Sequence, residues 1–515
     1  MGDAPENDVL RLLREAENRS ALTRNVEHLL SSLNSRRTDF CAVRQGAAEE
    51  LRMLVRHPAN FTSALTIKVG ETVLNCLAQR NEQPMLVQTL LHILSDLIID
   101  SQTLCHHLHK KNMIKTLTTH VSIYSNSVPH VKCLCVSALS VIAECCGPCC
   151  RQVVQQSFYS VFNCLKTTPE NERSMLVYII AVHTMLRPDG GGPTIHDPTD
   201  FVETLMHIYH RYNIQEIRNN IVYSLMQWLS LHPTTEHASA LMKYPRILNT
   251  LMDFFNSHNK EEGVPVLRIM GHLIYAEDDH VRAILDTNII TAIRCGISTY
   301  SIRMKVETLW FLSNVIAVRD PAIAQSIIED SPDLWDVFIR CAYARSFKLR
   351  REAMFCIINA LTALDESYMN RALHDFFGKL IVDTFEEFHN SPWRMKYVIE
   401  KSLLMLIRER IEQGSAGMIQ AALKLRFFDV FDHKITNFLQ HRIVMIDRNT
   451  VEFEMLTEVI DEGEKCLGTL RRIELAFEDL IGGPHGDNGM EVDEPVDVSE
   501  EIDNSTPMEI DFDLD

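Results

Sequence analysis

The sequence is poor in the residues that interrupt regular structure. It contains 19 glycines and 18 prolines among 515 residues, whereas leucine, isoleucine, valine and methionine are abundant. This balance favours helices over turn-rich sheets. No stretch of 18 consecutive apolar residues occurs, so we expect no membrane-spanning helix. The first twenty residues lack the apolar core of a secretory signal.

The chain also lacks the basic excess of a nucleic-acid-binding protein. It has 50 lysines and arginines against 69 acidic residues, which gives a net charge of −19. Residues 481–515 contain twelve acidic side chains and no lysine or arginine, and this leaves −7 for the first 480 residues. An acidic body argues against direct binding to nucleic acid. We expect the acidic tail to be disordered, with its ending MEIDFDLD as an alternative partner motif.

Fourteen cysteines without a secretory signal predict reduced thiols in the cytosol or nucleus. Four of them crowd the stretch ECCGPCC, residues 144–150, at positions Cys145, Cys146, Cys149 and Cys150. The embedded Cys-Gly-Pro-Cys is typical of thioredoxin-like exchange, but that chemistry needs a preceding strand.

Two other interpretations of this stretch are a zinc site and apolar packing. The zinc site would take further ligands from Cys105, His106, His107 and His109. We favour the second interpretation, in which the cysteines are small apolar side chains packed at the end of a helix. Gly147 and Pro148 would terminate that helix. The sequence therefore predicts no metal, no cofactor and no enzyme activity.

A period of about 43 residues runs through the chain. Seven apolar stretches resemble one another, from HILSDLIID at residue 92 to FCIINALTA at residue 355. Their fifth residues, which we call the anchors, are Asp96, Val141, Thr184, Gln227, His272, Asn314 and Asn359. The steps between anchors are 45, 43, 43, 45, 42 and 45 residues. A helical unit of this length is typical of armadillo and HEAT repeats.

We therefore expect an all-α fold, a right-handed superhelical solenoid of about ten armadillo repeats over residues 26–480. Each repeat should contain two shorter helices and a longer third helix that carries the anchor. The third helices should line a concave groove, which is the natural binding surface of such a solenoid. Residues 1–25 would form a short N-terminal segment and residues 481–515 the tail.

Three stretches in the C-terminal half make the family recognisable. SFKLRREAMFCIINALTA (346–363), KVETLWFLSNVIA (305–317) and PVLRIMGHLIYAEDDHVRAIL (265–285) resemble the eighth, seventh and sixth armadillo repeats of importin-α. GTLRRIELAFEDL (468–480) is similar to its short final repeat. The resemblance is specific over residues 265–363.

This resemblance implies a peptide-binding site. In importin-α, tryptophans of successive third helices hold the stems of lysines and arginines, and asparagines four residues later bond the peptide backbone. The positions that match this pattern are Trp310, Asn314, Phe355 and Asn359, the acidic Glu307 and Glu352, and Arg268 with His272 in place of the asparagine. The C-terminal, or minor, site of the family is thus largely present.

The N-terminal, or major, site departs from the family. The corresponding pairs are His92/Asp96, Ser137/Val141 and Ile180/Thr184, and none combines an aromatic ring with an amide. An acidic position of the third repeat is occupied by Cys145. No basic importin-β-binding segment is recognisable in the mixed-charge N-terminus. These differences weaken the expectation of standard binding to a nuclear localisation signal.

Two functions follow from the resemblance and its gaps. The first is a nuclear-import adaptor that binds basic cargo peptides mainly at the minor site. Importin-β and the recycling exportin would be its further partners, neither nucleic acid nor membrane would be bound, and it would work in cytoplasm and nucleus. The alternative is an armadillo scaffold with a remodelled groove and no classical import role.

Overall fold

The structure is a computed structural model. It describes residues 6–35, 41–56, 61–79, 82–99, 101–124, 128–167, 171–231, 233–257, 260–274, 278–318, 320–364, 380–381, 393–434 and 450–481, with single residues between 439 and 448. The acidic tail predicted at 481–515 lies outside these residues apart from Ile481, which ends the last helix. No helix in the described ranges has the length and apolarity needed to cross a membrane.

The seven anchors all fall within a single row of helices. This third-helix row comprises α4 (Pro84–Ile99), α7 (Pro129–Cys145), α9 (Glu172–Met185), α11 (Gln215–Leu231), α14 (Val264–Ile274), α17 (Ile302–Ile316) and α20 (Phe347–Ala363). It is extended by α2 (Cys41–Val55) before and by α23 (Trp393–Glu412) and α27 (Val451–Ile481) after. Each member contacts the next along the whole row. The predicted all-α solenoid of armadillo repeats is therefore confirmed.

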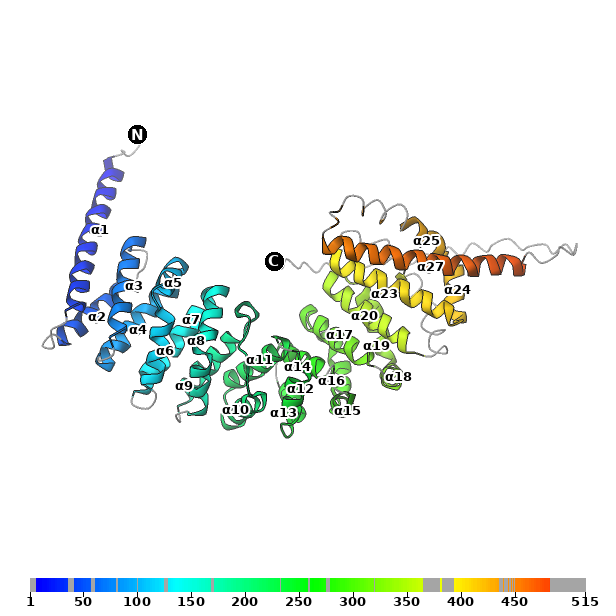
Figure 1. The fold of residues 1–515 in the computed structure, drawn as a ribbon, viewed down its shortest axis with the longest axis horizontal. Helices are drawn as coiled ribbons and strands as arrows, with labels where there is room; N and C mark the ends of the chain where they lie inside the picture. The colour runs from blue at the N-terminus through cyan, green and yellow to red at the C-terminus, as the bar shows by residue number, and fades with distance from the viewer. Residues whose placement is uncertain are drawn as a thin grey trace, which may run out of the picture.

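The remaining helices cover this row. They are α1 (Glu6–Leu33), α3 (Ser63–Leu77), α5 (Gln102–His109), α6 (Met113–Ile123), α8 (Gly147–Lys166), α10 (Pro198–Arg211), α12 (Thr235–Met242), α13 (Ile247–Ser257), α15 (Asp278–Leu285), α16 (Ile289–Gly296), α18 (Pro321–Asp330), α19 (Pro332–Ala342), α24 (Ala416–Lys424) and α25 (Phe427–Lys434). In Figure 1, α11, α14 and α17 lie on the inner side of the arc, and α10, α13 and α15 lie on its outer side.

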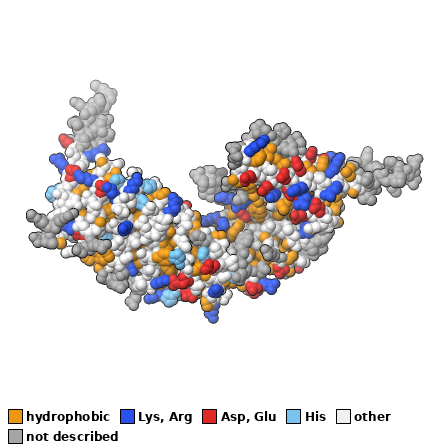
Figure 2. All heavy atoms as spheres, viewed as in Figure 1, with side chains coloured by type: hydrophobic (Ala, Val, Ile, Leu, Met, Phe, Trp, Pro, Cys, Tyr) orange, Lys and Arg blue, Asp and Glu red, His pale blue; other side chains and the backbone are white. Residues whose placement is uncertain are grey.

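Figure 2 shows the molecule hollowed on its upper side, between an N-terminal and a C-terminal arm. Charged side chains gather over the C-terminal arm. Ion pairs join α23 to α27 in this arm, namely Arg408 with Glu462 at 2.6 Å and Lys401 with Glu458 at 2.8 Å. One continuous apolar core runs beneath the surface from Val26 to Leu470. This is the packing expected of a solenoid, in which every repeat buries its faces against its neighbours.

A left-handed turn recurs between the first and second helices of a repeat. The four non-glycine residues with positive φ among those described are Asn112, Arg246, Asn288 and Arg426. They precede α6, α13, α16 and α25 respectively, which occupy the same place in their repeats. Asparagine tolerates this conformation better than arginine does. The shared turn supports the repeat assignment independently of the anchors.

Three of the anchored repeats depart from the predicted three-helix plan, and in the first of them α3 is the only described helix before α4. The 20-residue α8 replaces two shorter helices, and the short 3₁₀ helix η3 (Pro188–Gly190) stands where the next repeat should begin with a helix. Gly147 and Pro148 were expected to end α7, but they are instead the first residues of α8. Proline fits there because it has no backbone N–H, and the N–H groups of the first helical turn have no partner within the helix. Only Cys146 separates the two helices.

Candidate peptide-binding surface

The predicted site residues lie on three neighbouring members of the third-helix row. Arg268 and His272 are on α14, Glu307, Trp310 and Asn314 on α17, and Glu352, Phe355 and Asn359 on α20. Residues three or four apart share one face of a helix, so each set projects from one side. Because α14, α17 and α20 pack in order, the structure brings the three sets together. We call them the C-terminal surface.

Trp310 is the centre of this surface. Its indole is half-buried and lies against the backbone of α14 at Gly271. A β-carbon at Gly271 would stand only 2.3 Å from the ring, so a glycine is required for the ring to lie there. The neighbouring His272 ring meets the indole edge-on, with centroids 5.6 Å apart. These contacts with the preceding repeat fix the orientation of the indole.

The chain places its own cation on this indole. The Arg268 guanidinium carbon is 4.4 Å from the Trp310 ring centroid, within the range of a cation–π contact. The same guanidinium donates a hydrogen bond of 2.8 Å to Glu307 Oε1. An aromatic face and a carboxylate, one helical turn apart on α17, thus hold one guanidinium between them. The charge of Glu307 is already compensated within the chain.

Glu352 occupies a different environment from Glu307. It is 3% exposed and accepts a hydrogen bond of 2.7 Å from Nε of its neighbour Arg351. Burial raises the pKa of Glu352, and the Arg351 charge opposes that rise. Its partner Arg351 comes from the basic run KLRR at 348–351. The carboxylate therefore lies beneath the surface and not at its exposed rim.

The two asparagines differ in exposure. Asn314 is 7% exposed, so most of its amide lies between the packed helices. Asn359 is half-buried, and its Nδ2 donates a hydrogen bond of 3.0 Å to the carbonyl of Ser313 on α17. This bond links two repeats. An amide has two N–H donors and one carbonyl acceptor, so Asn359 keeps further hydrogen-bonding capacity.

His272 links the surface to the preceding repeat. Its Nε2 is 2.9 Å from the hydroxyl of Ser230 on α11. Burial lowers the pKa of His272, and the nearby Arg268 charge lowers it further. The ring is therefore neutral at neutral pH. The positive charge of this part of the surface comes from Arg268 alone among the predicted site residues.

Sequence reasoning did not single out the matching pair of the preceding repeat. Tyr223 and Gln227 are four residues apart on α11, and both are half-buried. Tyr223 meets the His183 ring edge-on, with centroids 6.0 Å apart. Gln227 Oε1 is buried and accepts no hydrogen bond from any residue that the structure describes. The anchor spacing contained this signal, since Gln227 is itself an anchor.

The N-terminal half of the row has a different character. Ser140 donates to Thr184 Oγ1 at 3.2 Å, and Thr184 donates to Glu144 Oε1 at 3.4 Å. These bonds join α7 to α9, and of the three residues only Thr184 is an anchor. No indole or amide takes part. These polar contacts thus come from hydroxyl and carboxylate groups and not from the aromatic–amide pairs of the family.

Comparisons with known proteins define the fold and nothing finer. Neither a protein-family model nor a curated protein matches the sequence. An engineered protein of known crystal structure matches 87% of this chain and 99% of its own, with a TM-score of 0.63 and 13% identity. A designed armadillo repeat protein matches 48% of this chain and 100% of its own, with a TM-score of 0.39 and 11% identity. At such identities, the first likeness shows a shared solenoid architecture alone.

Proposed function

We propose that this chain is an importin-α-like adaptor, which binds an extended basic peptide along α11, α14, α17 and α20. The observation that supports this most is the half-buried indole of Trp310, which packs against Gly271 and is already in contact with one guanidinium. An arginine or lysine of a peptide would meet the same kind of surface. The transport role itself rests on the resemblance of residues 265–363 to importin-α.

The residues of the C-terminal surface would divide the work of binding. A cationic side chain of the peptide would lie between the rings of Trp310 and Phe355, which belong to adjacent helices. The Asn359 amide would bond the peptide backbone and keep it extended. Arg268 would hold Glu307 and the indole in place. Phenylalanine is a weaker cation–π partner than tryptophan, so we expect Trp310 to dominate.

A fluorescence anisotropy titration tests this proposal. A labelled lysine-rich peptide should bind the wild type and lose affinity about 30-fold on Trp310→Ala, as expected of a tryptophan hot spot worth about 2 kcal/mol. Trp335→Ala is the matched control, because Trp335 is also half-buried but lies on α19. A peptide with glutamine in place of each lysine should not bind. Equal affinity of both tryptophan variants for the basic peptide would end the proposal.

A second candidate function is an armadillo scaffold without an import role. The observation that favours it is the N-terminal half of the row, where polar groups bond one another and no aromatic–amide pair is present. Affinity capture from nuclear extract separates the two functions. Importin-β, the recycling exportin and basic cargo would support the adaptor. Retention of other proteins without these three would support the scaffold.

A further inference from the structure

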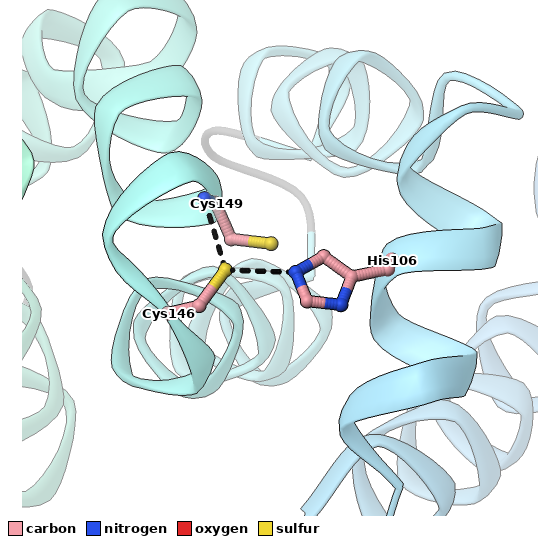
Figure 3. Close-up of side chains that lie close together, drawn as sticks. All are labelled: His106, Cys146 and Cys149. Atoms are coloured by element: carbon pink, nitrogen blue, oxygen red, sulfur yellow. Dashed lines mark hydrogen bonds between the residues drawn. The ribbon is translucent and has the colours of Figure 1, made fainter.

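The cysteine-rich stretch meets a histidine from another helix. His106 of α5 points at Cys146, with Nε2 3.1 Å from Sγ (Figure 3). Cys149, in the first turn of α8, completes a group of three whose ligand atoms all lie within 4.8 Å of one another. His106 is exposed, Cys146 is half-buried and Cys149 is buried. His106 and Cys146 are 40 residues apart in sequence, and the packing of α5 against the start of α8 brings them together.

Neither of the other two interpretations explains this arrangement. Thioredoxin-like exchange needs a strand before the motif, and helix α7 precedes it instead. Apolar packing explains the buried Cys149 and Cys150. It does not explain an exposed imidazole directed at a half-buried sulfur.

We propose that His106, Cys146 and Cys149 form a zinc site, with Cys105 as the fourth ligand. Sulfur and imidazole nitrogen are preferred zinc ligands, with bonds of about 2.3 Å and about 2.0 Å. Ligand atoms of such a tetrahedron lie roughly 3.3–3.8 Å apart, so the three atoms, now within 4.8 Å of one another, would have to move only a short way to bind the metal. Cys105 Sγ lies 3.9 Å from Cys149 Sγ, and a change of rotamer would have to bring it to the remaining corner.

The start of α8 supplies a hydrogen bond to one of the proposed ligands. Cys146 is its N-cap, and the sulfur accepts a hydrogen bond of 3.3 Å from the N–H of Cys149. The N-terminus of a 20-residue helix stabilises negative charge at that sulfur. Zn²⁺ would replace the protons of the three thiols, which pass to solvent, and take the lone pair of a neutral imidazole.

Cys150 provides an internal control within the same motif. Its Sγ points away from the group, 4.0 Å from the carbonyl of Thr184, and fills the space beside Gly190. A β-carbon at Gly190 would lie 2.5 Å from this sulfur. Cys150 is therefore a packing residue. Zinc at the other cysteines would clamp α5 to the junction of α7 and α8, where Gln102 already donates to the carbonyl of Cys145 at 3.0 Å.

The test uses the full chain, stripped of metal and kept reduced, and titrates it with Co²⁺ followed by Zn²⁺. The wild type should bind one equivalent, with the thiolate charge-transfer and d–d bands of tetrahedral cobalt, and zinc should displace it. Cys146→Ser with Cys149→Ser should abolish these bands, whereas Cys150→Ser should keep them. His106→Asn, an exposed substitution that leaves the core intact, should weaken binding at least tenfold.

Three results would overturn the assignment. The first is the absence of a stoichiometric cobalt spectrum in the folded wild type. The second is an equal spectrum in the Cys146→Ser/Cys149→Ser variant, which would place the metal on other thiols such as the exposed Cys41 and Cys295. The third is a Cys105–Cys149 disulfide that excludes metal. Unchanged cobalt affinity in Cys105→Ser would remove Cys105 from the ligand set.

Discussion

The N-terminal and C-terminal halves of the third-helix row share a backbone plan but not a surface. From α4 to α9, the half-buried positions of this face are His92, Asp96, Ser137, Val141 and Ile180, and no aromatic–amide pair is among them. From α11 to α20, the same face carries tyrosine, tryptophan and phenylalanine rings with amides and an Arg–Glu pair. The period of the solenoid is set by buried positions, which both halves keep. The half-exposed positions are free to change, so they separate one binding role from another.

Acid should affect the N-terminal half most strongly. Burial lowers the pKa of His183 on α9 to about 4, and Arg187 contributes. The unfolded chain binds this proton below about pH 6.5 and the folded chain does not, so stability falls as pH drops from 6.5 to 4. In the His183→Asn variant, the unfolding free energy should fall less over this pH range, by on the order of 2–3 kcal/mol.

Hydrogen exchange at pH 7 and pH 5 measures this effect region by region. In the wild type, α9 should lose more protection than α17 when the pH falls. The His183→Asn variant should show a smaller difference between the two helices. Equal acid sensitivity of wild type and variant would mean that the buried imidazole does not drive the loss.

Substitutions in the two halves of the third-helix row should also differ in their effect on peptide affinity. Trp310→Ala should weaken binding of a basic peptide by about 30-fold. Ser137→Ala changes the matching position of α7 and should leave the affinity within about twofold, because interface positions outside a hot spot contribute little. Isothermal titration calorimetry provides the comparison. A similar loss in both variants would show that the peptide uses the whole row.

The contact between Gly271 and Trp310 can be broken without removing the ring. Gly271→Ala introduces a β-carbon where the indole lies, and the ring must move. We expect a loss of about 1–3 kcal/mol in unfolding free energy, as for other overpacked sites. Gly46→Ala is the control, since a β-carbon there meets no atom within 4 Å. Chemical denaturation and tryptophan emission report stability and ring environment together.

Glycine substitutions at the left-handed turns should change stability the least. Arg246→Gly relieves the strain of a positive φ and should stabilise the chain by up to about 1 kcal/mol. Asn288→Gly should gain less, because asparagine tolerates this conformation. Thermal unfolding of the two variants ranks them. A loss of stability in Arg246→Gly would show that its side-chain contacts outweigh the backbone strain.

The sequence predicted the repeats well because their signal comes from buried residues at a fixed spacing. The anchors Asp96 to Asn359 all lie in third helices. The surface was less accessible to prediction. Whether Trp310 meets solvent or another side chain depends on how far α14 and α17 slide along each other, and no spacing within one helix reports that. The contacts of Arg268 with Trp310 and of Asn359 with Ser313 arise from that packing.

The cysteine stretch shows the same limit. Sequence spacing identified Cys105 and His106 as lying about one repeat before the motif, and the structure brings both to it. The start of α8 at Gly147 was missed, because proline after glycine ends one helix as readily as it begins the next. The direction of each thiol depends on that start. Cys149 and Cys150 are adjacent in sequence, yet they face different neighbours.

The apolar core from Val26 to Leu470 joins each repeat to the next. Because the curvature of a solenoid follows from the small rotation at each repeat, small changes at successive joints would add up in the distance between the arms. An extended ligand lying across four helices would fix three of these joints at once. It would therefore set the curvature of the whole protein. The distance between the two arms would then differ between the peptide-bound and the free protein.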